Sequence, residues 1–134
     1  MPRLRHGDAQ RGKGLKIRRK VRLRAEKAVT VRMLVDTGAT FSVIPLPLAR
    51  AVVIKRPRRS VTVRLADGRR LRLGADVAIV EIDGREAPVT ILLGKVDEPI
   101  LGVEALEALG LAVDPRRKRL SPSRPYAVRL GGYR

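Results

Sequence analysis

The sequence contains no cysteine or asparagine and very few aromatic residues. Without cysteine, the chain can form neither disulfides nor cysteine-ligated metal sites. Because aromatic residues make up only 2 % of the chain, its core has to be built from Val, Leu, Ile and Ala. Glutamine occurs once, at Gln10. This depletion of thermolabile side chains favours a thermophilic source.

Long apolar runs are also missing. No segment approaches the roughly 20 apolar residues needed to span a bilayer. No apolar stretch follows the basic N-terminus, as a signal peptide would require. We therefore expect a cytoplasmic protein with no membrane partner. The 134 residues are enough for one domain, and a domain of this size often gains stability by pairing with a second copy.

Acidic residues are scarce: 13 Asp and Glu stand against 30 Lys and Arg, for a net charge of +17. Such a charge would bind a polyanion such as nucleic acid by releasing counterions. Nucleic-acid modules usually interleave aromatic residues with basic ones, but Phe41, Tyr126 and Tyr133 lie outside the dense arginine clusters. We therefore interpret the charge as a solvated, arginine-rich surface, and nucleic acid is the less favoured partner.

The apolar residues alternate with polar ones along much of the chain, which predicts an all-β domain. The expected strands are residues 15–23, 29–35, 61–65, 71–73, 77–82, 87–93, 111–113 and 126–130. Asp67-Gly68 and Asp83-Gly84 each lie between two alternating runs. Asp-Gly in this position is a strong signal for a β-hairpin turn.

Two segments break the alternation. Pro45 and Pro47 limit the apolar run 41–48 to a short strand followed by a turn or helical start. Residues 103–109 have helical spacing and end before Gly110, a favoured residue after a helix, and they form the only convincing helix. The predicted organisation is a flexible basic arm (1–13), a β domain (14–115) and a basic, Pro-rich C-terminal segment (116–134).

The strand 29–35 runs directly into Asp36-Thr37-Gly38. Alone, this tripeptide is typical of an ordinary turn. The flanking residues are apolar, however, so the Asp36 carboxylate would be positioned at the end of a core strand and partly desolvated, as general acid–base chemistry requires. The Asp67-Gly68 hairpin could fold over a groove as a mobile lid. Downstream, Ile100-Leu101-Gly102 precedes the helix.

These motifs and their order resemble the retropepsin-like aspartic proteases, which comprise the retroviral proteases and their single-domain cellular relatives. The matching stretches are Val35-Asp36-Thr37-Gly38-Ala39-Thr40 and Pro99-Ile100-Leu101-Gly102. The resemblance covers roughly residues 15–113. It implies a small closed acid-protease-type barrel with one short C-terminal helix, assembled as a two-fold homodimer. In such a dimer the C-terminal segment 116–134, through its expected strand 126–130, could supply an interface strand.

The resemblance also implies a mechanism and a set of site residues. Because the chain has one Asp-Thr-Gly, the catalytic pair would be Asp36 from each of two identical chains, acting on a peptide or protein without cofactor or metal. Supporting residues of the catalytic loop would be Thr37, Gly38 and Ala39, with Ile100, Leu101 and Gly102 packed against it. The flap would be Ala66, Asp67, Gly68 and Arg69. Viral flaps are richer in glycine, and the basic loop 55–59 is the alternative location.

Two other interpretations stay open. The chain could be a catalytically silent dimer of the same fold that serves as a binding module for a partner such as nucleic acid. It could also be an ordinary small β-barrel in which Asp-Thr-Gly is a coincidence. The surroundings of Asp36 and a cleavage assay distinguish these alternatives from an aspartic endopeptidase.

Overall fold

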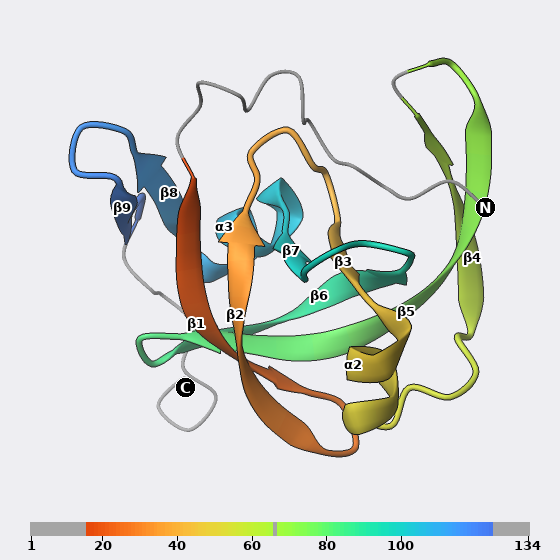
Figure 1. Cartoon of the computed structure of the whole chain (residues 1–134). Helices are drawn as coiled ribbons and strands as arrows, with labels where there is room; N and C mark the ends of the chain where they lie inside the picture. Colours follow the sequence, from red (N-terminus) through yellow and green to blue (C-terminus); the bar gives the residue numbers. More distant parts are fainter. Residues whose placement is uncertain (1–15, 66, 125–134) are drawn as a thin grey trace.

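The computed structural model describes residues 16–65 and 67–124, which form a mostly β structure with two short helices (Figure 1). The strands are β1 (Ile17–Arg24), β2 (Ala28–Val35), β3 (Ser42–Ile44), β4 (Arg59–Arg64), β5 (Arg70–Ile82), β6 (Arg85–Leu93), β7 (Ile100–Leu101), β8 (Leu111–Asp114) and β9 (Arg119–Pro122). The helices are α2 (Leu46–Ala51) and α3 (Val103–Leu109). The predicted arm 1–13 and the predicted strand 126–130 lie outside the described residues.

Seven of the strands form one sheet, in the order β1-β2-β7-β3-β6-β5-β4. An additional antiparallel pairing between β1 and β5 closes this sheet on itself, so that the strands from β1 to β5 in that order form a ring. The strand β4 lies outside the ring and pairs only with the first half of β5 (Figure 1). The all-β prediction is confirmed, while the two-fold homodimer stays a prediction.

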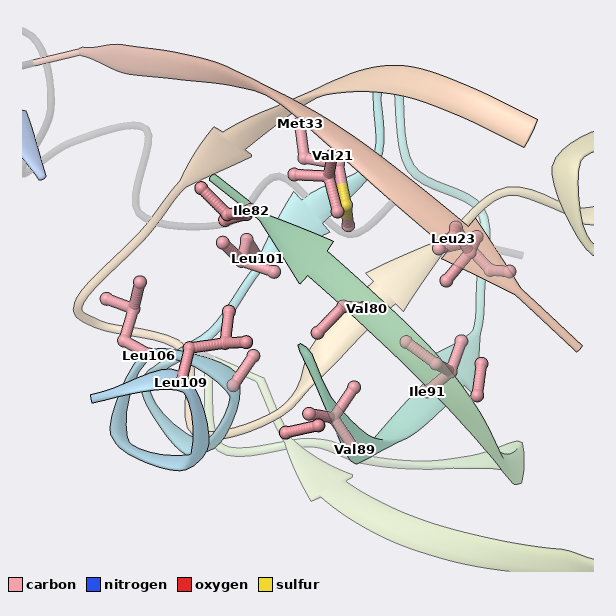
Figure 2. Packing of buried hydrophobic residues seen from close by; sticks show 14 of the residues in the cluster. Val21, Leu23, Met33, Val80, Ile82, Val89, Ile91, Leu101, Leu106 and Leu109 are labelled. Atoms are coloured by element: carbon pink, nitrogen blue, oxygen red, sulfur yellow. The ribbon is translucent and has the colours of Figure 1, made fainter. Parts of the chain in front are cut away.

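Aliphatic side chains fill the inside of the ring (Figure 2). Val21 and Leu23 from β1, Val80 from β5 and Ile91 from β6 have no exposed surface. Leu109 of α3 is equally buried and belongs to the same cluster. The predicted aliphatic core is therefore confirmed. Full burial of a large apolar side chain stabilises the folded state by about 1.5 to 3 kcal/mol.

The long strand β5 corrects one prediction. The expected break between residues 73 and 77 is wrong, because β5 runs without interruption from Arg70 to Ile82. Gly74 is paired on both sides, with Ser60 of β4 and Leu93 of β6. A Cβ atom built on Gly74 would lie 2.4 Å from Cγ of Pro57. Glycine at this position therefore allows a close approach of Pro57 and does not mark a turn.

The expectation of a single helix is also wrong, because α2 follows β3. The short strand and helical start predicted within residues 41–48 are confirmed by these two elements. Pro45 lies at its N-cap and Pro47 in its first turn. Proline is tolerated there, because the first backbone N–H groups of a helix have no partner within it. Two short strands, β7 and β9, were not predicted either. β9 pairs with β8 in an antiparallel hairpin.

Helix α3 agrees with its prediction and ends at Gly110, which has a left-handed φ of 69°. The last turn of α3 contains no basic residue. A cation is instead supplied by Arg85 of β6, whose Nη1 donates to the carbonyl oxygens of Leu109 and Gly110, both at 3.0 Å. A positive charge at this end of a helix is stabilising, because the unpaired carbonyl groups carry partial negative charge.

We expect Arg85→Met to lower the free energy of unfolding by about 2 kcal/mol, because the substitution keeps most of the apolar stem and removes the charged hydrogen bonds. Urea unfolding with an unchanged m-value measures this loss. Arg116→Met is the control: its side chain is exposed, and a change below about 0.5 kcal/mol is expected. Equal stability of the two variants would contradict the role of Arg85.

Candidate active site

Asp36 directly follows the last residue of β2, at the point where that strand has become fully buried. Met33, Leu34 and Val35 are all buried, as expected for the end of a core strand. Asp36 itself is 7 % exposed. In the part of the chain that the structure describes, Asp36 and Ser42 are the two buried polar side chains. A buried carboxylate needs polar partners to offset the loss of water.

The loop after Asp36 is folded around its carboxylate. The Gly38 backbone N–H donates to Oδ1 of Asp36 at 2.8 Å, and the Ala39 N–H donates to the Asp36 carbonyl oxygen at 3.1 Å. Thr37 and Gly38 are exposed, whereas Ala39 is buried. The turn therefore fixes the position of the carboxylate while the next two residues face solvent.

Strand β7 provides the second support of this loop. It lies between β2 and β3, parallel to β2 and antiparallel to β3. In this arrangement Val35 is paired with Leu101, and the Asp36 N–H donates to the Leu101 carbonyl oxygen at 3.0 Å. The structure thus brings Ile100 and Leu101 beside Asp36, although Asp36 lies more than 60 positions before them in the sequence.

Gly102 packs directly against the loop. A Cβ atom on Gly102 would lie 2.6 Å from the carbonyl carbon and oxygen of Phe41 and 2.9 Å from the carbonyl oxygen of Ala39. Real Cβ atoms do not come this close to backbone. Only glycine fits here, and its backbone angles are ordinary extended ones (φ −96°, ψ −179°), so the requirement is one of space.

The first turn of α3 is hydrogen-bonded to the same loop. The Val103 N–H donates to the Ala39 carbonyl oxygen at 2.7 Å, and the Glu104 N–H donates to that of Thr40 at 2.9 Å. The first N–H groups of a helix lack partners within it. Here the loop carbonyls satisfy two of them, which connects the start of α3 rigidly to the segment that carries Asp36.

Two supporting residues were missed from the sequence. The Ser42 hydroxyl oxygen accepts a hydrogen bond from the Gly102 N–H at 3.0 Å. The Glu104 carboxylate accepts bonds from the N–H and the hydroxyl of Thr90 on β6, at 2.9 and 3.0 Å. The sequence contains a signal for Ser42: it is a single hydroxyl in an apolar strand, and buried hydroxyls are almost always hydrogen-bonded.

The predicted flap corresponds to the β4–β5 hairpin. At its tip the Leu65 N–H donates to the Arg69 carbonyl oxygen at 2.7 Å, and Gly68 has a left-handed φ of 89°. The Arg69 N–H and side chain donate to the Asp67 carboxylate at 2.9 and 2.5 Å. These hydrogen bonds lower the pKa of Asp67 below its ordinary value, and the bond from the Arg69 backbone N–H has the largest effect. Ala66 lies outside the described residues.

One face of this hairpin packs against an apolar cluster to which a residue of the Asp36 loop also belongs. Val61, Val63 and Leu71 are partly buried against a second cluster, which contains Ala39 of the loop and Val43 of β3. The alternative flap segment forms no hairpin, because residues 55–58 lead directly into β4. Of the two segments, only residues 59–75 form a hairpin, and the role of this hairpin as a lid stays a prediction.

Other acidic residues have structural contacts. Asp83 lies in the β5–β6 turn with a φ of 51° and pairs with Arg19 at 2.6 Å. Glu98 accepts two hydrogen bonds from Arg18, at 2.8 and 2.9 Å. In residues 16–65 and 67–124, no three His, Asp or Glu side chains form a group that could bind a metal. No helix in these ranges is long and apolar enough to cross a membrane.

A mostly β domain with a buried aspartate in an Asp-Thr-Gly loop, supported by an apolar strand and a space-restricted glycine, is consistent with the aspartic proteases. A protein-family comparison agrees: the model described as "gag-polyprotein putative aspartyl protease" matches residues 21–108. The chain therefore belongs to this retropepsin-like family. The match extends from β1 into α3 and includes Asp36, the hairpin and Gly102. No curated protein matches the chain.

Proposed function

We propose that the chain is an aspartic endopeptidase that hydrolyses peptide bonds as a homodimer. The observation that carries this proposal is the buried Asp36, positioned by hydrogen bonds from Gly38 and to Leu101. Since the chain has one Asp-Thr-Gly, a pair of catalytic carboxylates requires two chains. A two-fold axis next to the exposed residues Thr37 and Gly38 would place the two Asp36 side chains face to face.

The chemistry follows from the behaviour of two adjacent carboxylates. Groups about 3 Å apart cannot both ionise readily, so the pair shares one proton, as the aspartic proteases illustrate. The ionised carboxylate accepts a proton from water, and this water attacks the scissile carbonyl carbon. The proton on the other Asp36 is donated in a hydrogen bond to the carbonyl oxygen as negative charge develops there. The tetrahedral intermediate then collapses: the C–N bond breaks, and the leaving amine nitrogen takes the proton that the first carboxylate accepted from water. Neither a covalent intermediate nor a cofactor takes part in these steps.

The loop contacts suit this role. Gly38 has no side chain that could obstruct an extended peptide above the carboxylates. The β4–β5 hairpin, whose apolar face contacts the cluster containing Ala39, would cover the substrate and exclude water. Thr37 would contact the opposite loop across the axis, and the single tip glycine, Gly68, would make the flap stiffer than a glycine-rich one.

Dimer-dependent cleavage tests the proposal. A fluorescently labelled, unstructured protein such as casein should be cleaved, and a hydroxyl-containing transition-state analogue of the pepsin-inhibitor type should block the cleavage. The specific activity should fall as the chain is diluted, in step with the monomer fraction measured by sedimentation. A dimer that cleaves nothing between about pH 3 and pH 8 would instead indicate the silent binding module.

A further inference from the structure

The β4–β5 hairpin has two different faces. Its apolar face, described above, packs against the cluster that includes Ala39. The strand alternation places Ser60, Thr62 and Arg64 of β4 on the opposite face. Arg70 and Arg72 of β5 share that face, because Arg64 is paired with Arg70 and Thr62 with Arg72. In Figure 1 this hairpin extends away from the ring of strands.

The basic loop before β4 lies on the same side. Side chains at Arg70, Arg72 and residue 74 point the same way along β5, and a Cβ on Gly74 would meet Pro57. Pro57 is therefore seated on the arginine face. Its neighbours in the loop, Arg56 and Arg58, and the nearby Lys55 therefore lie close to this face. We call the combined surface the basic hairpin face; it consists of Lys55, Arg56, Arg58, Arg64, Arg70 and Arg72, all exposed.

The positive charge of this face is not neutralised by the protein. Arg64 and Arg70 lie directly opposite each other, an arrangement of like charges that destabilises a hairpin. Within the described ranges, neither of them forms an ion pair, and the Arg72 side chain donates to the Ser60 hydroxyl. Asp76 and Glu26 line the pocket at the base of the face together with Lys55, Arg56 and Arg58. These two carboxylates are fewer than the six cations of the face.

Several arginines elsewhere form ion pairs with carboxylates. On β1, Arg18, Arg19 and Arg22 are paired with Glu98, Asp83 and Glu81, at 2.8, 2.6 and 4.0 Å. The tip arginine, Arg69, is paired with Asp67. Other exposed basic residues, such as Lys20, Arg32 and Arg116, also form no ion pair within the described ranges. The basic hairpin face differs from them because it brings six such residues together on one hairpin and the loop packed against it.

We propose that the basic hairpin face binds the phosphate backbone of nucleic acid, without base specificity. Guanidinium groups bind phosphate oxygens through two parallel hydrogen bonds, and a two-stranded β-ribbon fits the major groove of a duplex. A protein partner fits less well, since the interior of a protein interface needs apolar or aromatic anchors. The exposed side chains of this face offer none. None of the six residues of this face is aromatic, so stacking of bases on aromatic rings is not the expected source of affinity.

The inference does not depend on peptide hydrolysis, because the apolar face of the hairpin and Asp36 take no part in it. We expect Asp36→Asn to bind nucleic acid as the parent chain does. A negative result here would leave the proposed protease function unaffected, and a failure of the cleavage assays would leave this surface unaffected.

The test compares two triple variants of the full chain. Arg64→Gln/Arg70→Gln/Arg72→Gln removes three charges from the basic hairpin face. The matched control, Lys20→Gln/Arg32→Gln/Arg116→Gln, removes three charges from exposed positions on β1, β2 and the β8–β9 turn. Both variants have the same net charge. Far-UV circular dichroism and thermal unfolding check that both are folded.

The probe is a fluorescein-labelled, random-sequence DNA duplex of about 20 base pairs, followed by anisotropy over a range of KCl concentrations. We expect the hairpin variant to bind at least about tenfold more weakly at about 100 mM KCl, with a salt slope shallower by about 2.7 if three phosphate contacts are lost. The control should bind within about threefold of the parent chain.

Three results would overturn the proposal. One is no binding by the parent chain. Another is an equal loss of affinity in the two triple variants, which would show that net charge alone determines binding. The third is displacement of the duplex by polyglutamate at the same charge concentration, which would indicate an acidic protein as the partner.

Discussion

Asp36→Asn is expected to lower kcat for peptide cleavage by on the order of a thousandfold or more, because the amide can neither accept a proton from water nor share one with its counterpart. The fold should survive. The Asn amide oxygen can still accept the Gly38 N–H, which now donates to Oδ1 at 2.8 Å, so the loss in unfolding free energy should stay near 1 kcal/mol or below. Cleavage of a labelled peptide and urea unfolding measure the two quantities separately.

A mixing experiment sharpens this prediction. If the two catalytic carboxylates come from two chains, an excess of Asp36→Asn chains captures parent chains in inactive mixed dimers, and the activity of a fixed amount of parent chain falls. Asp83→Asn is the matched control: it makes the same chemical change at an exposed turn where φ is 51°, a conformation that asparagine tolerates. Cleavage retained by Asp36→Asn would show that Asp36 is not catalytic. Undiminished activity in the mixture would exclude a dyad shared between chains.

Local signals in the sequence were sufficient for much of the fold. Alternation located β1 and most of β2, because each has one face toward the core, and the apolar run 87–93 located β6, whose last three residues are all buried. Asp83-Gly84 located a hairpin in which both residues have positive φ. Helix α3 was predicted with its observed limits, since Gly110 marks its end. These features depend on neighbours in the chain, so a pattern of a few residues contains the information.

The missed elements depend on contacts between distant segments. Strand β7 has two residues and exists only because β2 and β3 lie on either side of it. Gly74 looked like a break because nothing in its own segment shows that Pro57 packs onto it. For the same reason, the motif predicted that Gly102 packs against the loop of Asp36, but it did not predict which atoms are in contact. The hydrogen bond between Gly102 and Ser42 becomes visible only when β3, β7 and α3 are placed in space.

Gly102→Ala is expected to have the second largest effect, about 3 kcal/mol of lost stability together with a loss of kcat. The new methyl group would lie 2.6 Å from the Phe41 backbone, and backbone, unlike a side-chain end, cannot move aside without displacing the loop. Overpacking of a rigid site typically costs 1 to 3 kcal/mol. Here the loop that moves carries Asp36, and a displacement of about 1 Å at a catalytic group can cost a hundredfold in rate.

Leu23→Ala separates the catalytic effect from simple destabilisation. Leu23 is fully buried and lies at the opposite end of β1 from Ile17, which pairs with Val35 beside the site. Its truncation should cost about 2 to 5 kcal/mol without moving the Asp36 loop. Measured at a temperature where both variants are folded and dimeric, kcat should fall only in Gly102→Ala. Equal kcat values in the two variants would mean that Gly102 contributes stability alone, and that the contact between Gly102 and the Asp36 loop does not determine the position of the carboxylate.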